Sequence, residues 1–227
     1  MLFLVNEQKK VIFGWSAKCG CSHIKNIFYY FQSGKMCKQG ESVHRGHDFQ
    51  ALPENLTPYV LIMFIRNPYK RLVSGFLDKY GPVGEFRHLW VVSSPITFSN
   101  FVDKLVNKNK VIDPHHFTPQ TSEHFCDRIR EHSSTHIFDI DSIDYSLLER
   151  TFNEKIPKEV LEYRGEHCYN YRKMESIDVF NIVIDEYHGR KPPLYCFYNG
   201  DILKKVENFY KEDFEFFSKK GFNYTVK

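Results

Sequence analysis

Residues 17–23, AKCGCSH, combine a lysine, a glycine and a hydroxyl residue in one short loop. An apolar run precedes the loop and helical spacing follows it, so we expect a strand, a tight turn and a helix. The first N–H groups of a helix attract anions. Gly20 would let the backbone approach such an anion, while Lys18 and Ser22 would add a positive charge and a hydroxyl donor. The loop alone fits a phosphate-like ligand and an ordinary strand–helix turn about equally well.

A second cationic segment, IRNPYKRLVSGF, covers residues 65–76. It places Arg66 at the end of a continuous apolar run and Ser74 inside the helix that follows. In a doubly wound sheet, ligands bind beyond the carboxyl ends of the strands, where Lys18 and Arg66 would both lie. Two cationic strand ends indicate a ligand with two separated anionic groups. Lys70 and Arg71 are interpreted as solvated surface charges.

The elements that must position these residues follow from hydrophobic periodicity. Continuous apolar runs predict buried strands, and apolar residues three and four apart predict helices. The predicted strands cover residues 11–16, 59–65 and 136–140. The first predicted helix runs from an N-cap at Ser22 to a stop at Gly34, and the others cover 72–80, 99–107 with Ser99 as cap, and 201–219. A further helix is predicted after 136–140, through Leu147 and Leu148, whereas 113–120 is predicted to be a loop.

Strands that alternate with helices predict an α/β fold with a mostly parallel central sheet flanked by helices. No repeat, low-complexity tract or linker interrupts the chain, so we predict a single domain over residues 1–227. The formal net charge of +3 argues against a nucleic-acid partner. No stretch approaches the ~20 apolar residues of a membrane span. As the chain stands we expect a cytoplasmic protein; if it is part of a longer one, the Golgi lumen or a membrane surface is the alternative.

Six cysteines among 227 residues are too few for a disulfide scaffold, and we expect reduced thiols. The chain has no CxxC pair and its eleven histidines do not fall at zinc-finger spacing, so no metal site is expected. Cys19 and Cys21 are interpreted as small loop residues, with a nucleophilic cysteine as the weaker alternative.

Taken together, the two cationic segments resemble the two cofactor-binding signatures of sulfotransferases, which use 3′-phosphoadenosine 5′-phosphosulfate (PAPS). The first signature is a P-loop-like turn that holds the 5′-phosphosulfate, and the second holds the 3′-phosphate through an Arg and a Ser. Ala17 stands where a proline is usual, and Cys21 where a Ser or Thr is usual. The resemblance implies that the cofactor is bound by Lys18, Cys19, Gly20, Cys21, Ser22, His23, Arg66 and Ser74.

Three further segments, DPHHFTPQ, HIFDI and YKEDFEFF, are similar to the carbohydrate sulfotransferases of the chondroitin, dermatan and uronyl 2-O branches. This similarity implies a carbohydrate hydroxyl as acceptor and in-line transfer of the sulfuryl group without a metal. Lys18 would stabilise the charge that develops on the leaving phosphate oxygen.

The acceptor hydroxyl must lose its proton, for which a histidine is the expected base at neutral pH. The stretch VHRGHDF resembles the histidine-containing segment that carries the base in uronyl 2-O-sulfotransferases. We expect His47 to be the base, with His44 as the second candidate. His115 and His116 in DPHHFTPQ are the alternatives.

Two other functions are open from the sequence. A P-loop-like kinase would need the order G-x-x-x-x-G-K-[ST] and a magnesium-binding carboxylate beside the loop, and neither is found. A non-catalytic relative that binds a phosphorylated or sulfated ligand would need no base, and several candidate histidines are present.

Overall fold

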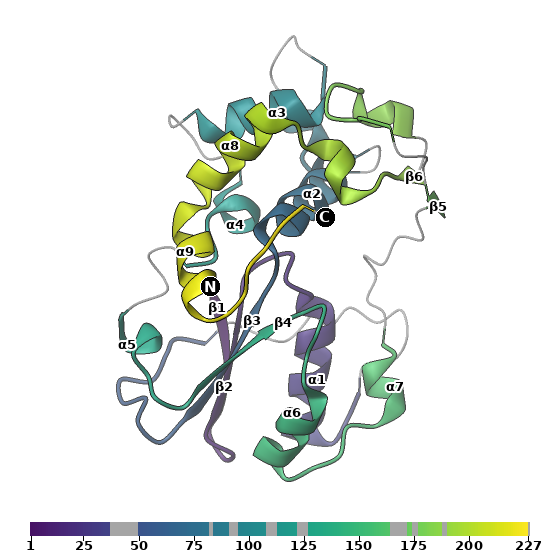
Figure 1. Ribbon diagram of the computed structural model, residues 1–227. Coiled ribbons are helices and arrows are strands. Elements are labelled where there is room, and N and C mark those ends of the chain that lie inside the picture. Colours follow the sequence, from purple (N-terminus) through teal and green to yellow (C-terminus); the bar gives the residue numbers. More distant parts are fainter. Residues whose placement is uncertain are drawn as a thin grey trace. The chain divides into compact units, whose positions relative to one another are not determined.

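The computed structural model describes residues 1–36, 50–81, 84–90, 95–107, 113–121, 127–163, 172–173, 177–187 and 190–226. The chain forms two compact units (Figure 1). The first, which we call the sheet unit, comprises Met1–Arg66 and Ser122–Cys168; the second, the helical unit, comprises Asn67–Thr121 and Tyr169–Lys227. The prediction of one domain stays a prediction. Among the helices described, none is long and apolar enough to cross a membrane.

A four-stranded sheet forms the centre of the sheet unit, in the order β1-β2-β3-β4. Its strands are β1 (Leu2–Asn6), β2 (Val11–Trp15), β3 (Val60–Ile65) and β4 (Thr135–Asp139). β2, β3 and β4 are parallel, and β1 is antiparallel to β2. Every residue of β2 and all but the first of β3 are buried, as continuous apolar runs predict. The predicted α/β class with a mostly parallel sheet is confirmed.

The edge strand β1 is not predicted from the sequence. Its apolar residues, LFLV, are too few to show a period, and only their pairing with β2 makes them a strand. The turn between the two strands is tight, and Lys10 adopts a positive φ of 53° in it.

The described residues of the sheet unit form the helices α1 (Cys21–Ser33), α5 (Asp127–Arg130), α6 (Tyr145–Phe152) and α7 (Lys158–Leu161). In Figure 1, α1, α6 and α7 lie together on one side of the sheet. Aromatic side chains pack α1 and α6 against strand β2 of the sheet. The Phe13 ring meets those of Phe28 and Phe152 edge to face, at centroid distances of 5.3 Å and 5.8 Å. The helix predicted after residues 136–140 and through Leu148 is present as α6, but it begins at Tyr145 and continues to Phe152.

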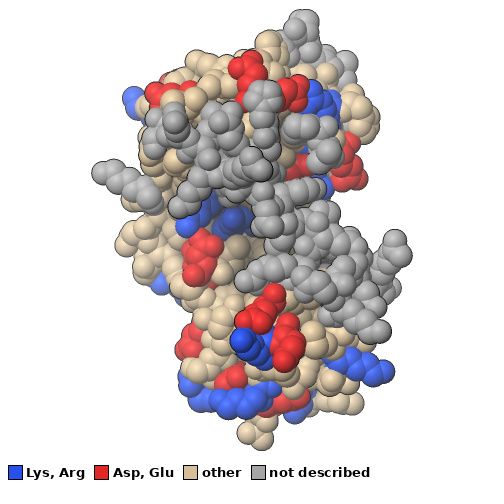
Figure 2. All heavy atoms as spheres, turned by 90° about the vertical axis from the view of Figure 1, so that its right-hand side faces the viewer, with Lys and Arg blue, Asp and Glu red and all other residues tan. Residues whose placement is uncertain are grey.

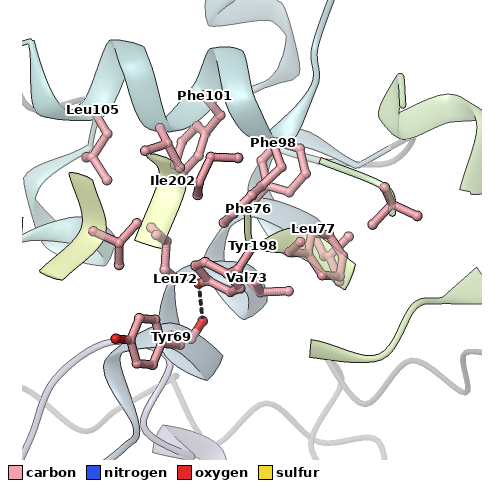
Figure 3. Packing of buried hydrophobic residues seen from close by; sticks show 14 of the residues in the cluster. Tyr69, Leu72, Val73, Phe76, Leu77, Phe98, Phe101, Leu105, Tyr198 and Ile202 are labelled. Atoms are coloured by element: carbon pink, nitrogen blue, oxygen red, sulfur yellow. Dashed lines mark hydrogen bonds between the residues drawn. The ribbon is translucent and has the colours of Figure 1, made fainter. Parts of the chain in front are cut away.

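The helical unit contains α2 (Pro68–Tyr80), α3 (Phe98–Val106), α4 (Pro114–Phe117), α8 (Gly200–Phe209) and α9 (Lys211–Lys219). Its described residues also form the short 3-10 helices η1 (Arg87–Leu89), η2 (Ile184–Tyr187) and η3 (Leu194–Phe197), and a parallel pair of strands, β5 (Arg172–Lys173) with β6 (Arg190–Lys191). Figure 3 shows its aromatic core, in which Phe76 from α2 packs against Phe98 and Phe101 from α3. The Tyr198 hydroxyl donates a hydrogen bond of 2.9 Å to the Tyr69 carbonyl oxygen.

Four predicted boundaries are wrong in detail. α1 is capped by Gly20 and not by Ser22, although its stop at Gly34 is confirmed. α3 is capped by Thr97 and not by Ser99, because the Thr97 side chain accepts from the Asn100 N–H. The loop predicted over 113–120 contains the short helix α4. The single helix predicted over 201–219 is divided into α8 and α9 at Tyr210, which leaves helical geometry and is buried.

Candidate anion-binding site

The loop between β2 and α1 has an unusual backbone. Lys18 adopts a φ of 67° and Gly20 a φ of 70°, so two residues of the turn are left-handed. Gly20 is the N-cap of α1 and has no side chain to cap the helix, and the first turn of α1 contains no acidic residue. The start of α1 therefore combines a positive helix end with a close backbone approach, the arrangement that suits an anion.

Arg66 joins the end of β3 to this loop. Its Nη1 atom donates a hydrogen bond of 2.8 Å to the carbonyl oxygen of Lys18. The parallel strands thus bring together two of the cationic residues that the sequence placed at strand ends. The hydrogen bond also supports the loop at its strained residue, because it holds the Lys18 carbonyl in place.

The end of β4 forms the neighbouring part of this edge. Asp139 is paired with Ile65, is 8% exposed, and accepts a hydrogen bond of 2.7 Å from the Asp141 N–H. The Ile140 side chain lies 3.7 Å from where a Cβ atom on Gly20 would stand. Space would therefore admit a methyl group at position 20, and it is the left-handed backbone that favours glycine there.

The remaining loop residues differ in their surroundings. Cys19 is fully buried in the core, and its N–H donates to the Ser16 carbonyl oxygen, so its side chain faces the protein interior. Cys21 and Ser22 are half-buried. The Nε2 atom of His23 lies 2.9 Å from the Tyr145 hydroxyl on α6. Their cofactor-binding roles stay predictions.

Lys25 is a residue of this region that the sequence analysis missed. It is 3% exposed, and its Nζ atom lies 5.9 Å from the centroid of the Trp15 ring. Burial lowers the pKa of Lys25, and the nearby Cys21 offsets part of this shift. The sequence offered one signal for Lys25, which is its position one helical turn after the loop. Because helical side chains lean toward the N-terminus of the helix, this position directs the Lys25 side chain back toward the loop.

Ser74 and Arg71 lie on α2 in the helical unit. Ser74 is half-buried. The interpretation of Arg71 as a solvated charge is wrong: it is 2% exposed, and its Nη1 atom donates a hydrogen bond of 2.8 Å to the Thr118 carbonyl oxygen. Arg71 is therefore a buried residue of α2 whose guanidinium binds a backbone carbonyl group.

The alternative base candidates occupy α4 of the same unit. The Nδ1 atom of His116 contacts the Asp113 carboxylate, and the ring stands at the edge of Phe86 at a centroid distance of 6.1 Å. His115 is exposed. His44 and His47, the first candidates for the base, lie outside the described residues.

Charged side chains elsewhere do not extend the cationic site in the visible part of the surface. On the face drawn in Figure 2, Lys and Arg lie among Asp and Glu, and the described residues there form no broad basic patch. The described part of the chain also contains no group of three His, Cys, Asp or Glu residues that could hold a metal ion.

An α/β sheet with a cationic strand–loop–helix turn at its carboxyl edge is compatible with many enzymes and other proteins that bind anions. Comparison with known families narrows this class: residues 1–220 match the model of the sulfotransferase family, and the chain belongs to that family.

The curated relatives are distant. The chain is 28% identical over 95 residues to carbohydrate sulfotransferase 8 of Mus musculus, a match that covers 37% of this chain and 23% of the relative. The match to carbohydrate sulfotransferase 8 of Homo sapiens has the same identity and covers 22% of that protein. This chain thus matches less than a quarter of the length of either relative. No solved structure matches it.

Proposed function

We propose that this protein transfers a sulfuryl group from PAPS to a hydroxyl group of a carbohydrate. Family membership supports a sulfotransferase, and the two distant relatives are named as carbohydrate sulfotransferases. The observation that carries the proposal is the hydrogen bond between Arg66 and Lys18, because it joins the two motif segments at one edge of the sheet.

In the proposed mechanism the loop holds the 5′-phosphosulfate. The N–H groups at the start of α1 and the Lys18 ammonium would bind its oxygens, and Lys18 would stabilise the phosphate oxygen from which sulfur departs. The sulfuryl group moves in line from that oxygen to the acceptor oxygen, so one S–O bond breaks as the other forms. Adenosine 3′,5′-bisphosphate and the sulfated acceptor are the products.

Arg66 and Ser74 would hold the 3′-phosphate. A guanidinium has five N–H donors, so the bond from Arg66 to the Lys18 carbonyl is compatible with contacts to a phosphate as well. The residue would then act twice, as a support of the loop and as a ligand. A base, for which His47 is our first choice, would accept the proton of the acceptor hydroxyl.

Calorimetric titration with adenosine 3′,5′-bisphosphate and with 5′-AMP tests this function. Charge-assisted hydrogen bonds contribute about 1.5–3 kcal/mol each, so the bisphosphate should bind at least about tenfold more tightly than 5′-AMP. The variant Arg66→Ala should remove most of that preference. Arg128→Ala is the matched control, since Arg128 is an exposed arginine of the sheet unit that also donates to carbonyl oxygens. Equal binding of the two nucleotides by the unaltered protein would contradict the proposal.

A further inference from the structure

A buried lysine lies beside the proposed phosphosulfate loop. Lys25 is 3% exposed, whereas lysine side chains usually extend into solvent. A buried ammonium group needs neighbouring groups or a bound anion that match its charge, so the surroundings of Lys25 indicate what it does.

Trp15 and Cys21 locate the ammonium group of Lys25. Nζ lies 5.9 Å from the centroid of the Trp15 ring, and Trp15 is the last residue of β2. Cys21, which interacts electrostatically with Lys25, is the first residue of α1 and lies one turn before it. The stem of Lys25 thus runs back along α1, and its charge lies where the strand ends and the helix begins.

This position matters for the ligand that the loop is proposed to bind. A 5′-phosphosulfate carries negative charge on both its phosphate and its sulfate group. Lys18 on the loop is one cation for these two groups, and a second cation reached from α1 would complement them better than the helix end alone.

From this placement we infer that Lys25 is a ligand-binding residue that supplies a second positive charge to the 5′-phosphosulfate site. The inference rests on the proposed function. Burial lowers the pKa of Lys25, and a bound anion would favour its charged form again. A purely structural role is the competing explanation, in which the stem packs on Trp15 and the charge is incidental.

The variant Lys25→Met separates the two explanations, because methionine keeps an unbranched apolar stem and removes the charge. Calorimetry would compare adenosine 3′,5′-bisphosphate with adenosine 3′-monophosphate, which lacks the 5′ group. We expect affinity for the bisphosphate to fall at least about tenfold, and affinity for the 3′-monophosphate to stay within about twofold. Lys25→Arg, which keeps the charge, should retain most of the affinity for the bisphosphate.

Lys35→Met is the matched control, since Lys35 is exposed just beyond the end of α1, and it should bind both nucleotides as the unaltered protein does. If Lys25→Met does not fold, Lys25→Gln takes its place. The ratio of its affinities for the bisphosphate and the 3′-monophosphate then distinguishes the two explanations. Unchanged binding of the bisphosphate, or an equal loss for both nucleotides with a lower thermal midpoint, would overturn the inference. Failure of the unaltered protein to bind the bisphosphate would instead overturn the proposed function.

Discussion

Lys18 combines an unusual backbone conformation with a proposed role for its side chain. Its φ of 67° is sparsely populated for a residue with a side chain and costs roughly 1–2 kcal/mol. Its carbonyl oxygen accepts the hydrogen bond from Arg66, which offsets part of that cost. We propose one catalytic role for its side chain, which is to bring a positive charge to the phosphosulfate.

We predict that Lys18→Ala lowers turnover much more than it lowers affinity for adenosine 3′,5′-bisphosphate. The charge on the leaving oxygen grows as the S–O bond breaks, so Lys18 contributes more in the transition state than in the bound product. A loss of turnover on the order of 10²-fold is expected, as for other groups that stabilise a developing anion. Steady-state kinetics and calorimetry on the same preparation provide the comparison.

The matched control for this variant is Lys10→Ala. Lys10 is an exposed lysine of the sheet unit that also has a positive φ, 53°, so its replacement carries a similar backbone change away from the loop. Turnover within about twofold of the unaltered enzyme in Lys18→Ala would show that Lys18 is an ordinary surface charge.

At the scale of elements, buried polar groups anchor the segment that follows α4. The Tyr210 hydroxyl donates to the Phe117 carbonyl oxygen, and the Arg71 guanidinium to that of Thr118. Asp213 on α9 accepts from the backbone N–H groups of Gln120 and Thr121 and from the Thr121 hydroxyl. Irregular backbone is thereby buried with its donors and acceptors satisfied, so helices distant in sequence determine the conformation of this segment.

We predict that Asp213→Asn destabilises the fold by about 1–3 kcal/mol, because an amide nitrogen cannot accept from a buried N–H. Burial raises the pKa of Asp213 above its ordinary value of 3.8. The folded state then binds the proton more tightly than the unfolded state. The resulting stabilisation is complete below pH 3.8 and is lost as the pH rises through the raised pKa; Asp213→Asn should remove this dependence. Urea unfolding at several pH values measures both effects.

Glu212→Gln is the control for Asp213→Asn. Glu212 is the neighbouring acidic residue in the first turn of α9, exposed to solvent, so the two variants change the same charge near the same helix end. If the two variants lose equal stability, the helix end and not the buried hydrogen bonds accounts for the effect.

At the scale of the whole molecule, two parts of the chain carry histidines that could serve as the general base of the proposed sulfuryl transfer. His44 and His47 belong to the segment between α1 and β3, whereas His115 and His116 belong to α4 of the helical unit. His116 has the chemical surroundings of a base, since the Asp113 carboxylate contacts its Nδ1 atom and would orient the ring.

We predict that His47→Ala lowers turnover by about 10²–10⁴-fold while bisphosphate affinity stays unchanged, which is the effect of removing a general base. His44→Ala tests the second candidate, three residues away, and should keep most of its turnover; a loss in His44→Ala with turnover kept in His47→Ala would make His44 the base. Should His47→Ala keep its turnover while His116→Ala and Asp113→Asn both lose it, the base belongs to α4 instead. Single-turnover kinetics with saturating PAPS separates these outcomes.

The sequence by itself determined the α/β class and the residues that flank the loop. Short continuous apolar runs bounded by turn residues are typical of buried strands. A loop that contains Lys18 and Gly20 and precedes helical spacing is typical of a turn from a strand into a helix. The tertiary structure decided what periodicity does not encode: the pairing that makes residues 2–6 a strand, the break at Tyr210, and the burial of Arg71 and Lys25. These depend on partners distant in the chain, such as the Thr118 carbonyl oxygen for Arg71 and the Lys18 carbonyl oxygen for Arg66. A basic side chain looks the same in a sequence whether it meets water or a buried carbonyl, because only the packed fold determines which of the two lies beside it.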